Sequence, residues 1–184
     1  MVINLNSLGT VCLTTKRCLL RKFEYNDSYQ AFINYLSNKE VAKYLTNDAH
    51  FSIYESEFLI NNFINNYNNI NYYNWAIINK VNNDIIGTIT IHEIDVFNDK
   101  GEIGIIISPL YQKKGYAKEV VRAIIDFAFF NLKIHRLEMK ILLNNISSNN
   151  LAKSLGFNYE GIIHSCVKKN NDYLDINLYY LINK

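Results

Sequence analysis

The chain has 184 residues, of which 49% are apolar, and it carries a formal net charge of +2. This length suits one domain with a buried core, and the small charge, without any long run of Lys or Arg, argues against nucleic acid as a partner. No stretch of about 18 apolar residues predicts a membrane span.

The N-terminal residues and the cysteines both favour a cytoplasmic protein. The opening MVINLNSLGTVCLTTKR lacks the basic-then-apolar order of a signal peptide. The three cysteines, Cys12, Cys18 and Cys166, are an odd number and lack the spacing of metal ligands. We therefore expect free thiols in a reducing compartment and no metal site.

Periodic apolar residues and turn signals predict the elements of the first half of the chain. The expected elements are a strand over 17–23, a helix that Asp27 or Ser28 caps, a short helical piece near 39–45 and a helix from Ser52 to about Tyr67. Glu55, three residues after Ser52, completes the pattern of a capping box.

The second half alternates strands with two helices. The expected elements are strands 73–80, 85–94 and 102–108, a helix over 116–131, a strand over 136–143, a short helix from Ser148 or Asn149 to Leu155, and a hairpin of 159–167 and 173–182. Consecutive strands favour antiparallel pairing. The order therefore predicts an α/β domain with a mixed, mostly antiparallel sheet rather than a doubly wound one.

A short polar segment, QKKGYA at 112–117, separates a buried strand from a helix. Free main-chain N–H groups at a helix start favour a bound phosphate, and Gly115 leaves room for it. Pro109 lacks an N–H, so we expect the strand to lose its pairing there and to admit an extended ligand. The alternative is an ordinary strand–helix loop with solvated lysines.

QKKGYA is similar to the Q/R-x-x-G-x-G/A signature of the GNAT superfamily of acetyl-CoA-dependent N-acetyltransferases. Downstream, NNISSNNLAKSLGFNYEG resembles the second motif of that family. LTTKRCLLRKFEYND and NNDYLDINLYYLI resemble the two ends of the subgroup that acetylates ribosomal-protein N-termini. The resemblance covers residues 13–184 and leaves 1–12 as an N-terminal extension. It implies a single GNAT-like domain with helices on both faces of a twisted sheet and a splayed central strand pair.

The resemblance implies an acetyl-CoA site along the loop and the strand before it. The pyrophosphate would lie on the main-chain amides of 113–117, and the pantetheine arm would run between strands 102–108 and 136–143. A main-chain N–H near Ile106 or Ile107 would polarise the acetyl carbonyl. The implied cofactor-binding residues are Ile105, Ile106, Ile107, Gln112, Lys113, Lys114, Gly115, Tyr116, Ala117, Lys118, Asn145 and Ser148.

The family also implies the group that handles the leaving thiolate. Ser148 matches a serine that lies near the sulfur in the ribosomal subgroup, and Asn145 matches a residue beside the pantetheine arm. Many other members carry a tyrosine where this chain has Ala152. Turn and helix-cap chemistry is the alternative role for Asn145 and Ser148.

Amine acetylation also needs a group that accepts a proton. Some members use a glutamate on the strand before the phosphate loop, and Glu102 has that placement, although an exposed carboxylate at a strand start would be unremarkable. The ribosomal subgroup can place a glutamate at the position of Val167 instead. His92 and Glu93 are further candidates.

The sequence as a whole predicts a cytoplasmic acetyltransferase in which an amine attacks acetyl-CoA directly in a ternary complex. The acceptor is a protein N-terminal α-amine or a small-molecule amine such as a polyamine or an aminoglycoside-like compound. No metal, nucleic acid or membrane partner is expected, and a homodimer is expected only because it is common in the family. Because Ala152 and Val167 depart from the family pattern, a non-catalytic acyl-CoA-binding sensor stays open, as does an interaction module without phosphate binding.

Overall fold

A mixed sheet of eight strands, in the order β1-β2-β3-β4-β5-β6-β8-β7, runs through the computed structural model, which describes residues 7–184. The strands are β1 Leu13–Thr14, β2 Cys18–Arg21, β3 Tyr73–Asn79, β4 Ile85–Asp95, β5 Lys100–Ile107, β6 Arg136–Leu142, β7 Asn158–Lys169 and β8 Asp172–Ile182. Neighbouring strands pair antiparallel except β5 and β6, which are parallel. The predicted mixed, mostly antiparallel sheet is confirmed.

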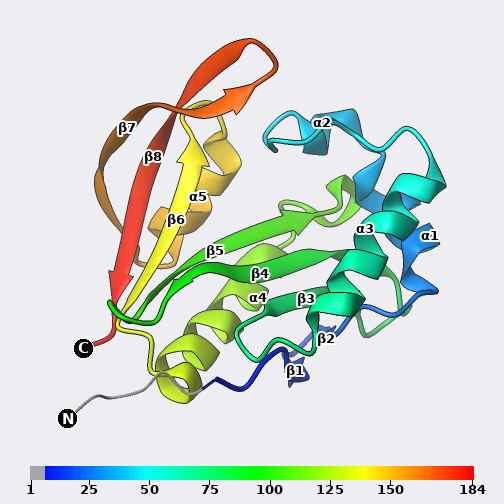
Figure 1. The fold of residues 1–184 in the computed structure, drawn as a ribbon, viewed down its shortest axis with the longest axis horizontal. Coiled ribbons are helices and arrows are strands. Elements are labelled where there is room, and N and C mark those ends of the chain that lie inside the picture. Colours follow the sequence, from blue (N-terminus) through cyan, green and yellow to red (C-terminus); the bar gives the residue numbers. More distant parts are fainter. Residues whose placement is uncertain (1–6) are drawn as a thin grey trace.

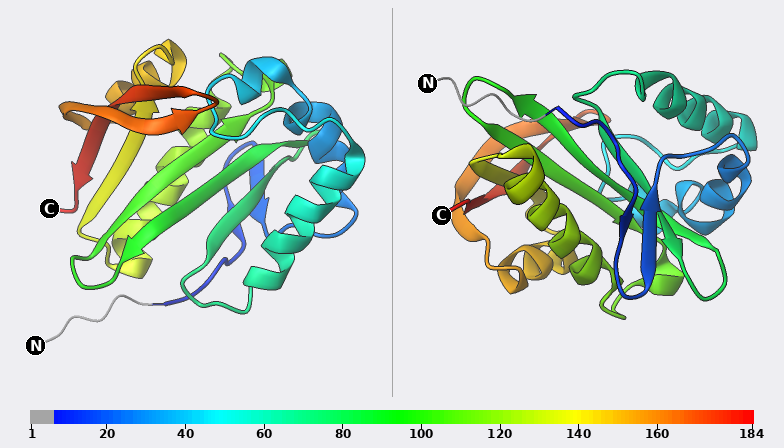
Figure 2. Two further views of the ribbon diagram at one scale, coloured as in Figure 1. Left: turned by 45° about the horizontal axis from the view of Figure 1, so that its top comes forward. Right: turned by 90° about the horizontal axis from the view of Figure 1, so that it is seen from below.

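Helices cover both faces of this sheet, as the family resemblance implied. The helical segments are α1 Asp27–Ala31, a π-helical turn Phe32–Leu36, α2 Lys39–Ala42, α3 Ile53–Asn66, a 3₁₀ turn Pro109–Tyr111, α4 Tyr116–Asp126, a π-helical turn Phe127–Leu132 and α5 Ile146–Ser154. Figure 2 shows α4 and α5 on one face and α1 and α3 on the other. The predicted helix over 116–131 is thus α-helical only to Asp126 and ends in a π-helical turn.

Two buried clusters fix these helices to the sheet. On the α4 face, Trp75 packs edge-on against Phe127 with ring centroids 5.7 Å apart, and Ile124 is completely buried beside them. On the other face, Tyr35 and Ile60 lie in a smaller cluster beneath α1 and α3. Apolar burial of this kind is the main term that stabilises the fold.

The central strands β5 and β6 separate along most of their length. They pair through three residue pairs, of which the last joins Glu102 to Glu138. Beyond it, β5 stays paired with β4 to Ile107 and β6 stays paired with β8, while the two strands diverge from each other (Figure 1). The splayed pair is confirmed, but the expected cause is wrong, because the separation begins at Ile103, well before Pro109.

The last short helix, α5, begins earlier than the sequence indicated. We expected it to start at Ser148 or Asn149, but it starts at Ile146. Its N-cap is Asn145, whose side-chain oxygen accepts the Ser148 N–H at 3.2 Å. An asparagine at this position satisfies one of the free donors of the first turn, which explains the earlier start.

The predicted cap of α1, Asp27 or Ser28, is wrong, because the N-cap is Asn26, whereas the predicted cap of α3 has the right place but no cap hydrogen bond. Asp27 lies inside the first turn of α1, and its carboxylate binds the Arg21 guanidinium instead of capping the helix. Ser52 is the N-cap of α3, but its hydroxyl makes no cap hydrogen bond. Glu55 accepts the N–H of Phe51, one residue before the expected partner, so the capping box is incomplete.

The segment before β1 packs along β3. The Thr10 hydroxyl donates to Tyr72 O and accepts the Asn74 N–H, and Val11 O accepts the Trp75 indole N–H at 2.6 Å. Of the predicted extension 1–12, residues 1–6 lie outside the described part of the chain. The boundary between extension and domain stays a prediction.

The end of β7, near the tip of the β7–β8 hairpin, contacts the end of α2. Lys169 Nζ donates to the main-chain oxygens of Ala42, Lys43 and Leu45 at 2.6, 3.2 and 2.7 Å. Oxygens at the end of a helix lack intrahelical donors, so an ammonium group is a suitable partner for them. One lysine therefore joins two segments that are far apart in the sequence.

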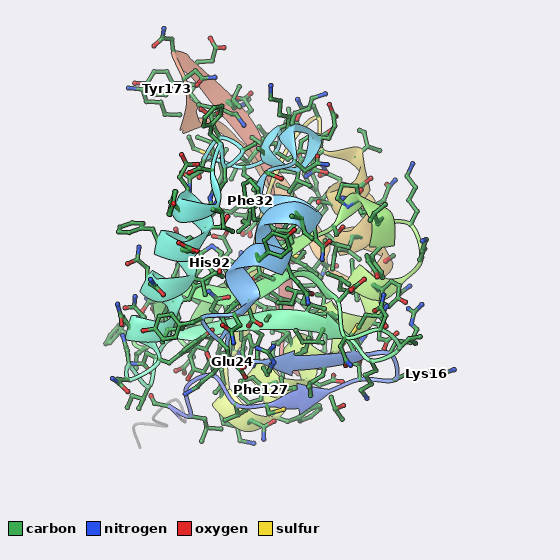
Figure 3. All side chains as sticks on the ribbon, turned by 90° about the vertical axis from the view of Figure 1, so that its right-hand side faces the viewer. Lys16, Glu24, Phe32, His92, Phe127 and Tyr173 are labelled. Carbon is green, nitrogen blue, oxygen red and sulfur yellow. The ribbon has the colours of Figure 1, made fainter. Side chains whose placement is uncertain are left out.

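Replacing Lys169 with Met keeps the apolar stem and removes the ammonium. We expect the free energy of unfolding to fall by about 1.5 kcal/mol, because charge-assisted hydrogen bonds contribute roughly this much. Urea unfolding measures the change. Lys168→Met is the matched control, since the Lys168 ammonium lies over the exposed ring of Tyr173 at the hairpin tip (Figure 3) and its loss should cost less than about 0.5 kcal/mol. Equal losses in the two variants would mean that the carbonyl contacts contribute nothing.

Candidate active site

The loop before α4 has the geometry of an anion site. Lys113 and Gly115 adopt left-handed backbone conformations with φ of 58° and 83°, and Gly115 is the N-cap of α4. Alternating backbone handedness of this kind turns successive N–H groups to one side. Among the hydrogen bonds recorded for residues 7–184, the main-chain N–H groups of 113–118 donate none. The loop therefore presents a set of free donors at the positive end of a helix.

The side chains that flank the loop are only partly directed at this site. Gln112 and Lys118 are exposed, and the Gln112 amide donates to Ile107 O at 2.9 Å. The Lys114 ammonium donates to Leu110 O at 2.7 Å. The loop is thus held by its own polar side chains, and its main chain is the part best placed to bind an anion.

Arg17 is a residue at this site that the sequence did not single out. Its Nη1 donates to Lys114 O at 2.9 Å, and its guanidinium lies over the Tyr116 ring. A side chain added at Gly115 would meet Arg17 Nη2 at 3.3 Å. No motif marked Arg17, because it lies far from the loop in the sequence and reaches it only through the fold.

Glu119, in the first turn of α4, holds Arg17 in place. Its carboxylate accepts the Thr15 hydroxyl, the Arg17 N–H and Arg17 Nε, each at 2.7 Å. Burial opposes ionisation of Glu119, but these hydrogen bonds outweigh it and lower its pKa below the usual range. The β1–β2 turn is therefore fastened to the loop by an ionised pair.

The fork between β5 and β6 exposes main-chain groups of β5. Ser108 N–H donates to Ile86 O, and the register between β4 and β5 is regular from Ile107 to Glu102. Since main-chain groups alternate along an antiparallel strand, those of Ile106 point to β4. Those of Ile105 and Ile107 point into the fork. Of the predicted trio, Ile105 and Ile107 thus have the orientation that an extended ligand needs, and the main chain of Ile106 does not.

Glu102 lies where β5 and β6 begin to separate. The sequence offered Glu102 as a candidate base, with an exposed strand-start carboxylate as the alternative, but Glu102 is buried, with 8% of its surface accessible. Lys140 Nζ is 2.8 Å from Oε2, off the line of a hydrogen bond, and His92 Nε2 is 3.4 Å from Oε1. Burial raises the pKa of Glu102, but the contacts with His92 and Lys140 outweigh burial and leave it lowered. Glu102 is therefore ionised at neutral pH.

Ser148 and Asn145 lie at the start of α5, beside the open end of the fork. Asn145 caps the helix, as the alternative interpretation expected, and Ser148 is partly exposed. Neither structural role excludes contact with a ligand. Their proposed roles toward a cofactor stay predictions.

Asn149, which the sequence marked only as a helix start, ties this segment together. Its buried amide donates to Leu142 O and Asn145 O, at 3.1 and 2.8 Å. Its oxygen accepts from the Asn177 amide and the Tyr179 hydroxyl, at 2.7 and 3.0 Å. Asn149 therefore joins α5 to the end of β6 and to β8.

The two departures from the family pattern lie in different elements, Ala152 one turn after Ser148 on α5 and Val167 on β7. Ala152 is completely buried in the α4-side core, and Val167 pairs with Leu174 in the β7–β8 hairpin. Within residues 7–184 there is no group of three or more His, Cys, Asp or Glu that could hold a metal ion. None of the helices in that range has the length and apolar character needed to cross a membrane.

Comparison with known proteins identifies the family. The model of the acetyltransferase (GNAT) domain matches residues 17–158. The chain is 32% identical over 171 residues to the uncharacterized N-acetyltransferase YnaD of Bacillus subtilis, with 92% of this chain and 95% of the relative covered. It is 29% identical over 96 residues to the ribosomal-protein-serine acetyltransferase of Escherichia coli, covering 52% and 54% of the two chains.

A solved structure has the same fold. The crystal structure of spermidine N-acetyltransferase from Vibrio cholerae, in complex with CoA and spermine, superimposes with a TM-score of 0.76. Its sequence is 24% identical, and 91% of this chain and 96% of that chain are covered. The geometry of the loop before α4, the fork beside it and the family match agree, and the chain belongs to the GNAT family of N-acetyltransferases.

Proposed function

We propose that this acetyltransferase binds acetyl-CoA along the loop 112–118 and the fork, and transfers the acetyl group to a primary amine by direct attack in a ternary complex. The observation that carries the proposal is the set of free N–H groups at 113–118, which lies at the open end of the fork. A pyrophosphate on these amides would place an extended thioester arm against β5.

The main chain of β5 would hold the thioester. The outward-facing groups of Ile105 and the N–H of Ile107 would pair with the pantetheine arm as a neighbouring strand does, while Ile107 O already accepts the Gln112 amide. One of their N–H groups would polarise the acetyl carbonyl and stabilise the oxyanion that forms on attack. Asn145 and Ser148 would line the other side, with the Ser148 hydroxyl able to protonate the leaving thiolate.

The acceptor is an amine of one of two kinds, and relatives support each. One relative is named as acting on a ribosomal-protein serine, and a structural neighbour was solved with spermine. We favour a protein N-terminal α-amine and retain polyamines and other small amines as the alternative. The homodimer stays a prediction from the resemblance.

Acetyl-CoA should stabilise the protein against heat. A ligand at about 100 times its Kd adds roughly 2.7 kcal/mol to the free energy of unfolding, which raises the melting midpoint measurably. Desulfo-coenzyme A should give a similar shift and ATP should give none. No shift with either coenzyme A compound would leave the loop as an ordinary strand–helix connection and contradict the proposal.

Gly115→Glu should abolish the shift caused by acetyl-CoA. The new carboxylate would occupy the position of the pyrophosphate, and its charge would repel it. Gly156→Glu is the matched control, because Gly156 has a similar φ of 87° and open space around it, so the backbone strain is alike. The proposal predicts that Gly156→Glu lowers stability but keeps the shift, and a lost shift in both variants would contradict it.

Ser148→Ala should lower kcat by at least about tenfold and leave the acetyl-CoA midpoint shift unchanged, since proton donation acts on the chemical step. Steady-state thiol release with peptide and polyamine acceptors measures kcat. Ser147→Ala changes the exposed neighbour and serves as the control. If both variants turn over like the wild type, Ser148 contributes only to the first turn of α5.

A further inference from the structure

A polar cluster lies on the face of β4 and β5 opposite α4. His92, on β4, pairs with Glu102 on β5, and Thr90 pairs with Gly104. Apolar neighbours of His92 on the same strand, such as Ile91, belong to the α4-side core, so the alternating side chains face the other way. The His92 side chain is 45% exposed, whereas that of Glu102 is 11% exposed. In Figure 1 no helix crosses this face between α3 and β6, and Figure 3 labels His92 there.

The imidazole lies directly over the main chain of Gly104. A Cβ at position 104 would meet Thr90 Oγ1 at 2.9 Å and His92 Cε1 at 3.1 Å. Position 104 thus needs a residue without a side chain to keep the ring in this place. The next residue, Ile105, turns its N–H into the fork. The ring is therefore one residue from the proposed donor to the acetyl carbonyl.

Glu102 is poorly suited to accept a proton itself. It is buried, and its Oε2 lies 2.8 Å from Lys140 Nζ, whose positive charge stabilises the ionised carboxylate. Lys140 also bonds to Glu93 on β4, so the charges near the ring are Glu93, Glu102 and Lys140. Within residues 7–184, β4 forms side-chain hydrogen bonds with α1 and the π-helical turn after it through the neutral amides of Gln30 and Asn34, both at Ile85. The carboxylate can instead orient the ring.

This orientation leaves one ring nitrogen available. An ionised Glu102 favours a proton on the facing Nε2, 3.4 Å away, and apo distances of this kind commonly tighten when substrate binds. Nδ1 then carries the lone pair, 3.2 Å from Thr90 Oγ1. The Thr90 hydroxyl can turn to Gly104 O, 3.4 Å away, and release Nδ1.

We propose that His92 accepts the proton of the attacking amine through Nδ1, and that Glu102 is a positioning residue that holds the ring. This inference rests on the proposed acetyl transfer and names its proton acceptor. The ammonium gives one proton to Nδ1, and the nitrogen lone pair attacks the thioester carbon. The C–N bond forms and the C–S bond breaks. The Ser148 hydroxyl gives its proton to the leaving thiolate and takes the second proton of the amine in return. The imidazolium then releases its proton to water.

The test compares three isosteric variants, His92→Asn, Glu102→Gln and His135→Asn. The probes are acetyl-CoA with a serine-terminated peptide and, separately, with spermidine. His135 is an exposed histidine before β6 and should behave like the wild type. We expect His92→Asn to lower kcat/KM by at least about 10²-fold, the usual contribution of a general base, and to remove the acid limb of its pH profile. The acetyl-CoA midpoint shift should be unchanged.

Two further measurements separate a base from a structural residue. Added imidazole should restore activity to His92→Ala and have no effect on His135→Ala. Glu102→Gln should keep more activity than His92→Asn, because the imidazole remains and loses only the carboxylate that orients it. Imidazole nitrogen shifts in NMR should show the Nε2–H form of His92 in the wild type and a mixture of forms in Glu102→Gln.

The outcomes distinguish this inference from the proposed function. Wild-type protein without an acetyl-CoA midpoint shift would overturn the proposed function. If His92→Asn shows a normal acetyl-CoA midpoint shift and full activity, only the role of His92 is overturned. If Glu102→Gln is inactive while His92→Asn is active, Glu102 is the base. If the wild-type protein shows a normal acetyl-CoA midpoint shift but no turnover with either acceptor, the NMR measurement decides. Finding the Nδ1–H form of His92 in the wild type would contradict the proposal.

Discussion

The separation of β5 from β6 is the constraint on which the rest of this structure depends. Buried main-chain N–H and C=O groups must find partners, yet beyond Glu102 the inner edge of β5 has no neighbouring strand. The two half-sheets still form one body, because β5 continues to pair with β4 and β6 with β8. The result is an open edge in the middle of a sheet, where an extended ligand can complete the hydrogen bonding. The loop before α4 lies at the mouth of this edge and adds free N–H groups to it.

Local signals in the sequence were sufficient for the order of elements and for the loop. Alternation marked the strands, and Gly115 marked the loop, where the structure has a left-handed N-cap that few other residues adopt without strain. The predicted start of α5 was wrong because Asn145 competed with Ser148 as a cap, and propensity alone does not decide between two such residues. The separation of the central strands was predicted, but Pro109 was the wrong reason. Strand divergence depends on the twist and packing of the whole sheet.

The residues that sequence patterns missed act over long separations. Arg17 contacts Lys114, and Lys169 binds the end of α2. Asn149 is a single buried amide with partners on β6 and β8. Each is a common polar residue in a segment where a solvated side chain would be expected. Only the fold brings these partners together, so a periodicity or spacing rule has nothing to detect. The burial of Glu102 was missed for the same reason, since its partners come from β4 and β6.

The two substrates would be recognised by different parts of the chain. The proposed cofactor side would rely on main-chain groups, which any sequence with the right backbone can supply, so few residues mark it and a family signature is enough to find it. On the other face, recognition would depend on side chains. Thr90, His92 and Glu102 lie together above Gly104, and the position of each side chain depends on which residues are its neighbours. On this proposal, changes there would alter proton transfer and acceptor choice without disturbing the loop or the fork. The backbone alone would then not determine which amine is acetylated, and the side chains of that face would determine it.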